Sequence, residues 1–393
     1  SFITSFISHH YHVLILSMIK STKKIKLAII GSRGYPYVYG GYETFVKELS
    51  ERLVNTQIEV HVYCQKDLFL NKPKCLNGVW LHYIPTLPQK SLNQLVHSFL
   101  SMIHVTFSKT DAVLVVNLAA GPLGWLPKLT GKKVLINLDG IEWKRPKWKG
   151  LGVIYFKFGA WCATKFYDAL IADAEAMRQV YLKRFGIESE VIAYGAPEFI
   201  DRPITFLEKF NLKPEEYYLI VGRLIPDNNA DLLIEEFLNS NSNKKLVVVG
   251  DTPYNDSFTN KLKSLASDKL IFTGYVKNQD ELLSLYQHCF AYLHGHEFGG
   301  TNPAMLKAMA YKCAILALDT VFNREMLSEG VFGVFFEKSK GSLKNKIEEI
   351  ENKPNHIVLL KEKVENGITD KYKWDNVVNQ YINLVKKLLG NNT

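Results

Sequence analysis

The stretch CFAYLHGHEFGGTNPAMLKAMA, residues 289–310, contains an apolar run, a glycine-paired turn and the start of a helix. Residues 289–293 are typical of a buried strand, and the polar turn at 294–302 follows them. Proline is favoured at the first helical position because its missing N–H would find no partner there, so Pro303 marks the helix start. Free N–H groups at a helix start, next to glycines that admit a ligand, form an anion site. An ordinary strand–turn–helix connection is the alternative.

Units of this kind recur along the whole chain. Short apolar runs are separated by patterns at helical spacing, which predicts parallel strands joined by crossover helices. A polar segment with three prolines, residues 194–216, divides the units into two series. We therefore expect an α/β protein with two Rossmann-like, doubly wound domains facing across a cleft at the carboxyl ends of the strands. The expected strands are 26–30, 59–63, 79–84, 112–117, 134–137, 169–172 and 190–192, then 217–221, 246–249, 270–272, 291–294 and 314–317.

Positive charge is concentrated in the first half. Residues 1–200 contain 24 Lys and Arg against 14 Asp and Glu, a net charge of +10, whereas the remainder contains 24 against 25, a net charge of −1. Within residues 128–165, nine basic residues interleaved with aromatic ones face two acids. Such a face suits anionic lipid, a phosphorylated substrate or nucleic acid, although scattered solvated lysines give the same counts. No nucleic-acid module accompanies the charge, so nucleic acid is not an expected partner.

The apolar runs and the cysteines indicate the cellular compartment in which the protein is expected. The sequence has no run of about 18 apolar residues, so no membrane-spanning helix is expected. The five cysteines form no C-x-x-C pair, and most lie in apolar runs, as reduced cytoplasmic thiols do. Residues 1–17 lack the basic leader and cleavage site of a signal peptide, and we expect them to be an extension outside the fold.

Polar residues follow several expected strands of the second half, where ligands of such sheets bind. Arg223 follows the strand at 217–221, and its guanidinium offers a fork of donors suited to phosphate oxygens; a structural salt bridge is the alternative. His294 and His296 end the strand before the glycine turn, where we expect substrate contact or turn packing. There is no Asp-x-Asp pair to hold a metal ion beside a diphosphate, so we expect a metal-independent site.

The first half has its own glycine-rich segment, GSRGYPYVYGGYETF, between a strand and a helix. Gly40 and Gly41 allow backbone N–H groups to approach a phosphate or a sugar. The segment is not the G-x-G-x-x-G fingerprint of dinucleotide-binding domains. Glu43, in the first helical turn, is explained equally well as an acid that matches the helix dipole or as a substrate contact.

A second segment of the first half, INLDGIEWKRPKWKG, ends a strand inside the basic region. Asp139 is the candidate for orienting or activating an acceptor hydroxyl. A solvated loop of paired acids and bases is the alternative. The candidates for binding the acceptor, with the basic residues on its phosphate, are Glu142, Trp143, Lys144 and Arg145.

The segments GSRGYPYVYGGYETFVKEL, NLDGIEWKRPKW, VGRLIPDNN and HGHEFGGTNPAMLKAMA resemble the retaining GT-B glycosyltransferases of family four. They are particularly similar to bacterial polysaccharide rhamnosyltransferases. The resemblance covers about residues 24–390. It implies an acceptor-binding N-terminal domain at 18–198 and a nucleotide-sugar-binding C-terminal domain at 199–373. A final helix within 374–393 would then cross back to the first domain.

The resemblance also implies roles for single residues. Arg223 and Asp139 take the catalytic roles, on the leaving diphosphate and on the acceptor hydroxyl. Asn228 stands where relatives commonly have lysine, and Lys307 replaces a glutamate that accepts from ribose hydroxyls. Lysine has no acceptor, so ribose binding is rebuilt, the donor differs or activity is reduced. The implied donor-binding residues are Gly40, Gly41, Arg223, Asn228, Tyr275, Val276, His294, Gly299, Gly300, Thr301, Asn302 and Lys307.

The implied activity is transfer, with retention, of a sugar such as rhamnose from a dTDP- or UDP-type donor. The acceptor is a polyprenyl-diphosphate-linked sugar of bacterial polysaccharide or capsule biosynthesis. The nucleotide sugar is a substrate, and no cofactor is expected. Residues 128–165 would bind an anionic membrane surface, which makes this a cytoplasmic protein, peripheral at the inner face of the cytoplasmic membrane. Lys307 motivates a second hypothesis, a catalytically weak sugar-nucleotide-binding partner of an assembly complex, and a GT-B sugar-nucleotide epimerase is a third.

Overall fold

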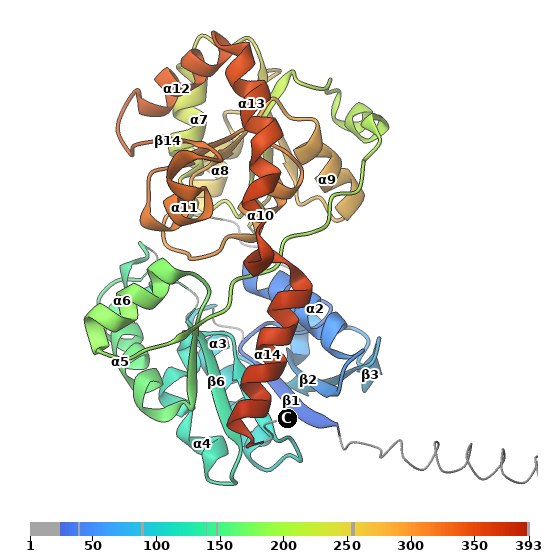
Figure 1. Ribbon diagram of the computed structural model, residues 1–393, viewed down its shortest axis with the longest axis vertical. Helices are drawn as coiled ribbons and strands as arrows, with labels where there is room; N and C mark the ends of the chain where they lie inside the picture. The colour runs from blue at the N-terminus through green and yellow to red at the C-terminus, as the bar shows by residue number, and fades with distance from the viewer. Residues whose placement is uncertain are drawn as a thin grey trace, which may run out of the picture.

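The structure is a computed structural model that describes residues 24–37, 40–87, 90–138, 140–146, 148–252 and 256–390. These residues form two α/β domains, with the N-terminal domain below the C-terminal domain in Figure 1. Each domain is built on one mainly parallel sheet with crossover helices. The predicted class, two doubly wound α/β domains, is confirmed.

The N-terminal sheet has the order β3-β4-β2-β1-β5-β6-β7-β8, and β3 alone pairs antiparallel, with β4. The central strand β1 reads IKLAII and is buried along almost its whole length, as expected for a strand covered on both faces. The strands are β1 (Ile25–Ile30), β2 (Ile58–Gln65), β3 (Cys75–Leu76), β4 (Val79–Ile84), β5 (Ala112–Val115), β6 (Lys133–Leu138), β7 (Ala169–Ala172) and β8 (Glu190–Val191).

Helices of the N-terminal domain bury one apolar stripe each against this sheet. In α2 the buried apolar side chains are Phe45, Val46, Leu49 and Leu53, at the spacing of one helical face. Gly40 is the N-cap of α2, so the helix begins at Gly41 and Glu43 lies in its first turn. The helices are α2 (Gly41–Leu53), α3 (Lys90–Thr106), α4 (Trp125–Lys128), α5 (Leu151–Phe166) and α6 (Glu175–Phe185).

The C-terminal sheet is parallel throughout and has the order β11-β10-β9-β12-β13-β14. Its strands are β9 (Tyr217–Val221), β10 (Lys245–Val249), β11 (Leu270–Gly274), β12 (Ala291–His294), β13 (Ile315–Leu318) and β14 (Val334–Phe336). Its helices are α7 (Ala230–Leu238), α8 (Ser257–Lys263), α9 (Gln279–Gln287), α10 (Pro303–Ala310), α11 (Val321–Met326), α12 (Ser342–Glu351) and α13 (Pro354–Val364). As predicted, α10 begins at Pro303.

The final helix, α14 (Trp374–Leu388), lies along the N-terminal domain (Figure 1). The Tyr381 hydroxyl donates a buried hydrogen bond of 3.1 Å to Oδ1 of Asn137 at the end of β6. The Phe45 ring of α2 lies 5.7 Å from the Tyr381 ring and 6.2 Å from the Trp374 ring. A Cβ added at Gly195 would lie 2.2 Å from the Trp374 ring, so only glycine lets the linker pass here. The last helix therefore packs on the N-terminal domain and the linker, after the chain has left the C-terminal domain.

No helix in the described ranges combines the length and apolar character needed to cross a bilayer.

Candidate functional site

The N-terminal ends of α2 and α10 meet at the domain boundary. A Cβ added at Gly41 would lie 3.5 Å from the ring of Pro303, the first residue of α10. A Cβ added at Gly40 would lie 3.8 Å from Nε of Arg223. The structure thus brings together glycines of one domain and the predicted phosphate-binding arginine of the other, although these residues are far apart in sequence.

Glu43 lies beneath this junction and is 0% exposed. Its Oε1 lies 2.7 Å from Nη1 of Arg33, a residue of the glycine-rich segment that the sequence analysis missed. Its Oε2 is buried and accepts no hydrogen bond from the described residues. A side chain at Gly40 would approach Oε2 to 3.1 Å. Glu43 is therefore one half of a buried ion pair with one oxygen still directed at the junction.

The Arg223 loop is braced from within the C-terminal domain. The Asn228 side chain is 8% exposed and its Nδ2 donates to the carbonyl oxygen of Arg223 at 2.8 Å. Gly222, Arg223, Asn228 and His296 together line a small cavity at the end of β9. Asn228 thus shapes the Arg223 loop through its amide N–H, and its contact with the donor stays a prediction.

His294 and His296 stack on each other at the end of β12, with ring centroids 4.6 Å apart. His294 is 0% exposed and its Nδ1 lies 3.1 Å from the Tyr292 hydroxyl, so its predicted contact with the donor is wrong. Burial, and then the charges of Arg223 and Arg145, lower the pKa of His296 to about 3. His296 is therefore neutral at physiological pH.

The glycine turn before α10 has most of its helix-start donors occupied. Asn302 Oδ1 accepts from the N–H groups of Ala304 and Met305 at 2.9 and 3.4 Å. The N–H of Thr301 donates to a carboxylate oxygen of Asp173 in the N-terminal domain. The expectation that Thr301 and the first turn of α10 present free N–H groups is therefore wrong for the domain arrangement in this structure. A Cβ at Gly299 would meet open space, so that side of the turn is accessible.

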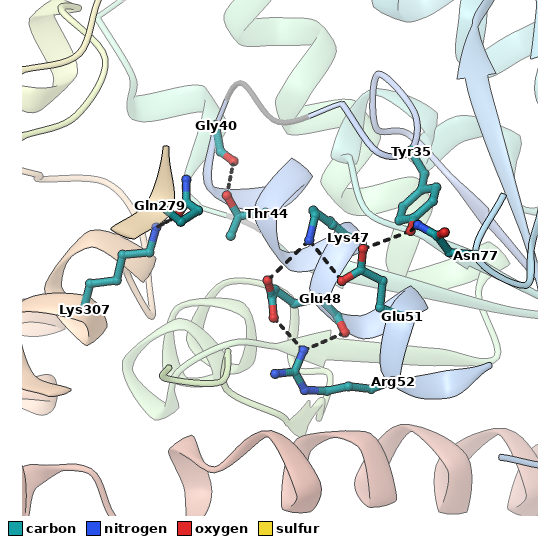
Figure 2. Close-up of polar contacts among 10 residues, drawn as sticks. All are labelled: Tyr35, Gly40, Thr44, Lys47, Glu48, Glu51, Arg52, Asn77, Gln279 and Lys307. Atoms are coloured by element: carbon teal, nitrogen blue, oxygen red, sulfur yellow. Dashed lines mark hydrogen bonds and ion pairs between the residues drawn. The ribbon is translucent and has the colours of Figure 1, made fainter. Parts of the chain in front are cut away.

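Lys307 points from α10 toward the same boundary. Its Nζ donates to Oε1 of Gln279 at 3.4 Å (Figure 2). Burial lowers the pKa of Lys307, and the charge of Glu48 on α2 opposes that decrease. Glu48 is itself held by Arg52 at 2.5 Å. Lys307, at the position where the resemblance implies a glutamate, is thus a cation. It donates to Gln279 of α9 and lies within the electrostatic influence of Glu48 on α2.

The segment after β11 has one exposed and one buried residue. Tyr275 is 47% exposed, whereas Val276 is 6% exposed and belongs to the core. Burial, Tyr37 and Glu43 all raise the pKa of Tyr275, which places its hydroxyl within the influence of the N-terminal domain. Gly274 has φ +67°, which turns the chain there. Tyr275 remains a candidate for contact with a base, whereas the Val276 side chain is buried in the hydrophobic core.

The predicted acceptor segment is a network of ion pairs. Asp139 lies outside the described residues. Glu142 accepts from Nε1 of Trp148 at 2.9 Å and lies 2.7 Å from Nε of Arg145. Nη1 of Arg145 lies 3.5 Å from Oδ2 of Asp227 in the C-terminal domain. Arg145 thus links the two domains through Asp227, and its guanidinium already has carboxylate partners where the sequence predicted an acceptor phosphate.

Trp143 is 6% exposed and packs edge-on against Tyr181, with ring centroids 5.8 Å apart. The Arg184 guanidinium covers it at 5.3 Å. Its predicted contact with the acceptor is therefore wrong, because the indole belongs to the core. Lys144, next to it, is exposed and remains a candidate.

Three junction residues were missed by the sequence analysis: Arg33, Asp173 and Asp227. Asp173 directly follows β7, and residues at the carboxyl ends of strands are the usual site residues of such sheets. That position was a signal that could have identified it. Within the described ranges no three His, Cys, Asp or Glu side chains lie close enough to hold a metal ion.

Comparison with known proteins identifies two family models. Residues 204–367 match the model described as glycosyl transferases group 1. Residues 24–75 and 122–197 match a domain of unknown function, DUF1972. A Campylobacter jejuni protein is 24% identical over 174 residues, which cover 43% of this chain and 47% of that protein. Its name is N-acetylgalactosamine-N,N'-diacetylbacillosaminyl-diphospho-undecaprenol 4-alpha-N-acetylgalactosaminyltransferase. The match spans about half of that relative.

Solved structures match over nearly the whole chain. Sucrose-phosphate synthase from Thermosynechococcus elongatus superposes with a TM-score of 0.80 at 14% identity, covering 94% of this chain and 100% of the other. HepE from Anabaena in complex with UDP-glucose superposes with a TM-score of 0.72 at 13% identity, covering 92% and 100%. The predicted GT-B architecture is confirmed: the protein has the fold of the GT-B glycosyltransferases, and its C-terminal domain carries the match to glycosyl transferases group 1.

Proposed function

We propose that this protein is a glycosyltransferase that takes a sugar from a nucleotide-diphosphate donor bound at the α2–α10 junction. One observation carries the proposal: Gly40 and Gly41 of one domain lie against Arg223 and Pro303 of the other. Backbone amides that approach closely and a guanidinium are the groups that hold a diphosphate. The glycosyl transferases group 1 match covers Arg223 and Pro303, and a structural neighbour was solved with UDP-glucose.

Arg223 would stabilise the negative charge that develops on the leaving diphosphate. The acceptor hydroxyl would approach from the side of residues 136–150, and front-face attack would retain the anomeric configuration. The resemblance to polysaccharide rhamnosyltransferases favours rhamnose from a dTDP- or UDP-type donor. The name of the Campylobacter relative, which acts on a diphospho-undecaprenol sugar, favours a lipid-diphosphate-linked acceptor.

An apolar stripe on α5 supports an association with the membrane in which such an acceptor resides. Leu151, Ile154, Phe158 and Trp161 are 83, 62, 52 and 47% exposed. Their spacing of three, four and three residues places them along one face of the helix. Exposed lysines flank the stripe, and each contributes about 1 kcal/mol near an anionic surface. The proposed membrane surface is therefore this face of α5, not the whole basic region.

The activity is tested by incubation with a panel of nucleotide sugars and lipid-diphosphate-linked GlcNAc or Glc, with mass spectrometry of the lipid. We expect one donor to add a single sugar, and Arg223→Ala to abolish the product. Lys261→Ala, which removes an exposed cation from α8 of the same domain, is the matched control and should retain activity. No added sugar with any donor would contradict the proposal.

Lys307 motivates the second candidate, a catalytically weak sugar-nucleotide-binding partner of an assembly complex. Such a partner would bind UDP or dTDP and transfer nothing to the lipid. An epimerase, the third candidate, would alter the nucleotide sugar without any acceptor. Analysis of the donor with the acceptor omitted identifies an epimerase, and analysis of the lipid with the acceptor present separates a transferase from a binding partner.

A further inference from the structure

Two carboxylates, one from each domain, accept hydrogen bonds from backbone N–H groups of the other domain. Asp173, after β7 of the N-terminal domain, is 2% exposed, and its Oδ2 accepts a hydrogen bond of 3.0 Å from the Thr301 N–H. The Thr301 hydroxyl donates to the backbone carbonyl of Asp173. In return, Glu325 on α11 of the C-terminal domain accepts from the N–H groups of Glu175 and Ala176 at 2.9 and 2.8 Å. We call these two sets of bonds the clasp.

Glu325 supplies a cap that α6 lacks in its own sequence. The N-cap of α6 is Ala174, which has no side-chain hydrogen bond to offer. The first N–H groups of a helix have no partner within the helix, so both oxygens of Glu325 satisfy donors that would otherwise be unpaired. Helices α6 and α11 face each other across the boundary (Figure 1). Separation of the domains would therefore uncap α6.

The clasp also explains the second glycine of the turn. A Cβ added at Gly300 would lie 1.9 Å from Oδ1 of Asp173, so no other residue lets the carboxylate reach Thr301. At the other end of the turn, the Phe298 carbonyl accepts from the N–H of Ile141 at 3.2 Å. The turn thus belongs to the C-terminal chain but is fastened at both ends to the N-terminal domain.

We propose that Asp173 is a positioning residue that fixes the turn of residues 299–302 only when the two domains are closed, with Glu325 as its counterpart. Helix α11 touches the turn as well, because the Asn302 N–H donates to Sδ of Met326 at 3.3 Å, next to Glu325. Opening breaks both halves of the clasp together, so closure and assembly of the donor site are one event. The link to the donor rests on the proposed function, whereas the link to closure does not.

Closure is measured as an interdomain distance by pulsed electron paramagnetic resonance. One spin label is placed on Cys75, the exposed one of the five cysteines, and the other on an introduced cysteine, Lys261→Cys. We expect one short distance for the parent protein. Asp173→Ala and Glu325→Ala should each add longer distances. Asp173→Asn keeps an acceptor for the Thr301 N–H and should retain the short distance.

Glu188→Ala is the control, because it removes an exposed carboxylate that, among the described residues, pairs with Arg178 of its own N-terminal domain. Titration with UDP and dTDP then tests the donor arm. Asp173→Ala should weaken binding about tenfold, which corresponds to about 1.4 kcal/mol, whereas Asp173→Asn should stay within about threefold.

Unchanged distances in both alanine variants would overturn the proposal. Tighter nucleotide binding by Asp173→Ala would also overturn it, because Asp173 would then compete with the diphosphate for Thr301. If neither UDP nor dTDP binds the parent protein, the proposed function fails, but the distances still decide whether Asp173 and Glu325 hold the domains closed.

Discussion

Arg145→Ala is expected to destabilise the junction between the two domains. The Arg145 side chain is 12% exposed and lies 2.7 Å from Glu142 and 3.5 Å from Asp227, which is 3% exposed. Removal of one partner from a buried ion pair leaves an uncompensated charge, which costs about 3–5 kcal/mol. Each kcal/mol changes the Tm of a domain of 150–250 residues by about 2–4 °C, so the expected decrease in Tm is about 6–20 °C.

Thermal unfolding followed by circular dichroism and by tryptophan fluorescence measures this decrease. Lys144→Ala is the matched control, because it removes the adjacent, exposed cation and should change stability by no more than about 0.5 kcal/mol. Asp227→Ala removes the partner in the other domain. The double variant of Arg145 and Asp227 should lose less than the sum of the single losses, because both substitutions remove the same contact.

A Tm for Arg145→Ala within about 2 °C of the Lys144→Ala value would refute this reasoning. If the same variant then failed to bind a lipid-diphosphate acceptor, the sequence-based assignment of Arg145 to the acceptor phosphate would be restored. If instead the Tm falls strongly and the variant still binds the acceptor at low temperature, Arg145 stabilises the domain junction and does not bind the acceptor.

Three further predictions follow from the described contacts. The double variant Ile154→Glu with Phe158→Glu should abolish sedimentation of the protein with anionic vesicles, and high salt should weaken the sedimentation of the parent protein. Val358→Glu, at a similarly exposed position on α13, is the control and should still sediment. Vesicle binding that the double variant leaves unchanged would show that α5 is not the membrane surface. Burial lowers the pKa of His97, which is 0% exposed, to about 4, so below pH 6.5 the unfolded chain binds the proton more readily. Stability should fall by about 3 kcal/mol between pH 6.5 and 4, and urea unfolding of His97→Leu should show a flatter profile. Lys307→Glu places a second carboxylate near Glu48 and should not raise turnover; a gain of more than about tenfold would favour the weak-partner hypothesis.

The sequence pattern predicted most of the strands because buried parallel strands are short apolar runs with turns at both ends. β14, Val334–Phe336, was missed, because three residues between glycine-containing turns carry too little periodicity to distinguish a strand from a loop. The glycine turn and the start of α10 were predicted correctly, because proline at the first helical position is a local signal.

The parts of the site that were predicted wrongly depend on contacts distant in sequence. Trp143 lies among basic residues in sequence, but its indole packs on Tyr181, which no local pattern shows. The Thr301 N–H of the turn donates to Asp173, which is 128 residues away in sequence. His294 was placed in contact with the donor because it ends a strand, but the fold buries it completely beneath His296. Local signals thus located the site, whereas tertiary contacts decided which side chains face it.

The charge available to a ligand in the cleft is smaller than the cation count suggests. Arg33 is paired with Glu43, and Arg145 with Glu142 and Asp227, so these guanidinium groups already have carboxylate partners when the domains are closed. A diphosphate would compete with those acids for donors, because each donor satisfies one strong acceptor at a time. Affinity must then come from geometry that only the assembled junction provides. If the proposed function holds, donor binding should therefore depend on the attachment of the turn to Asp173 more than on the net charge of the N-terminal half.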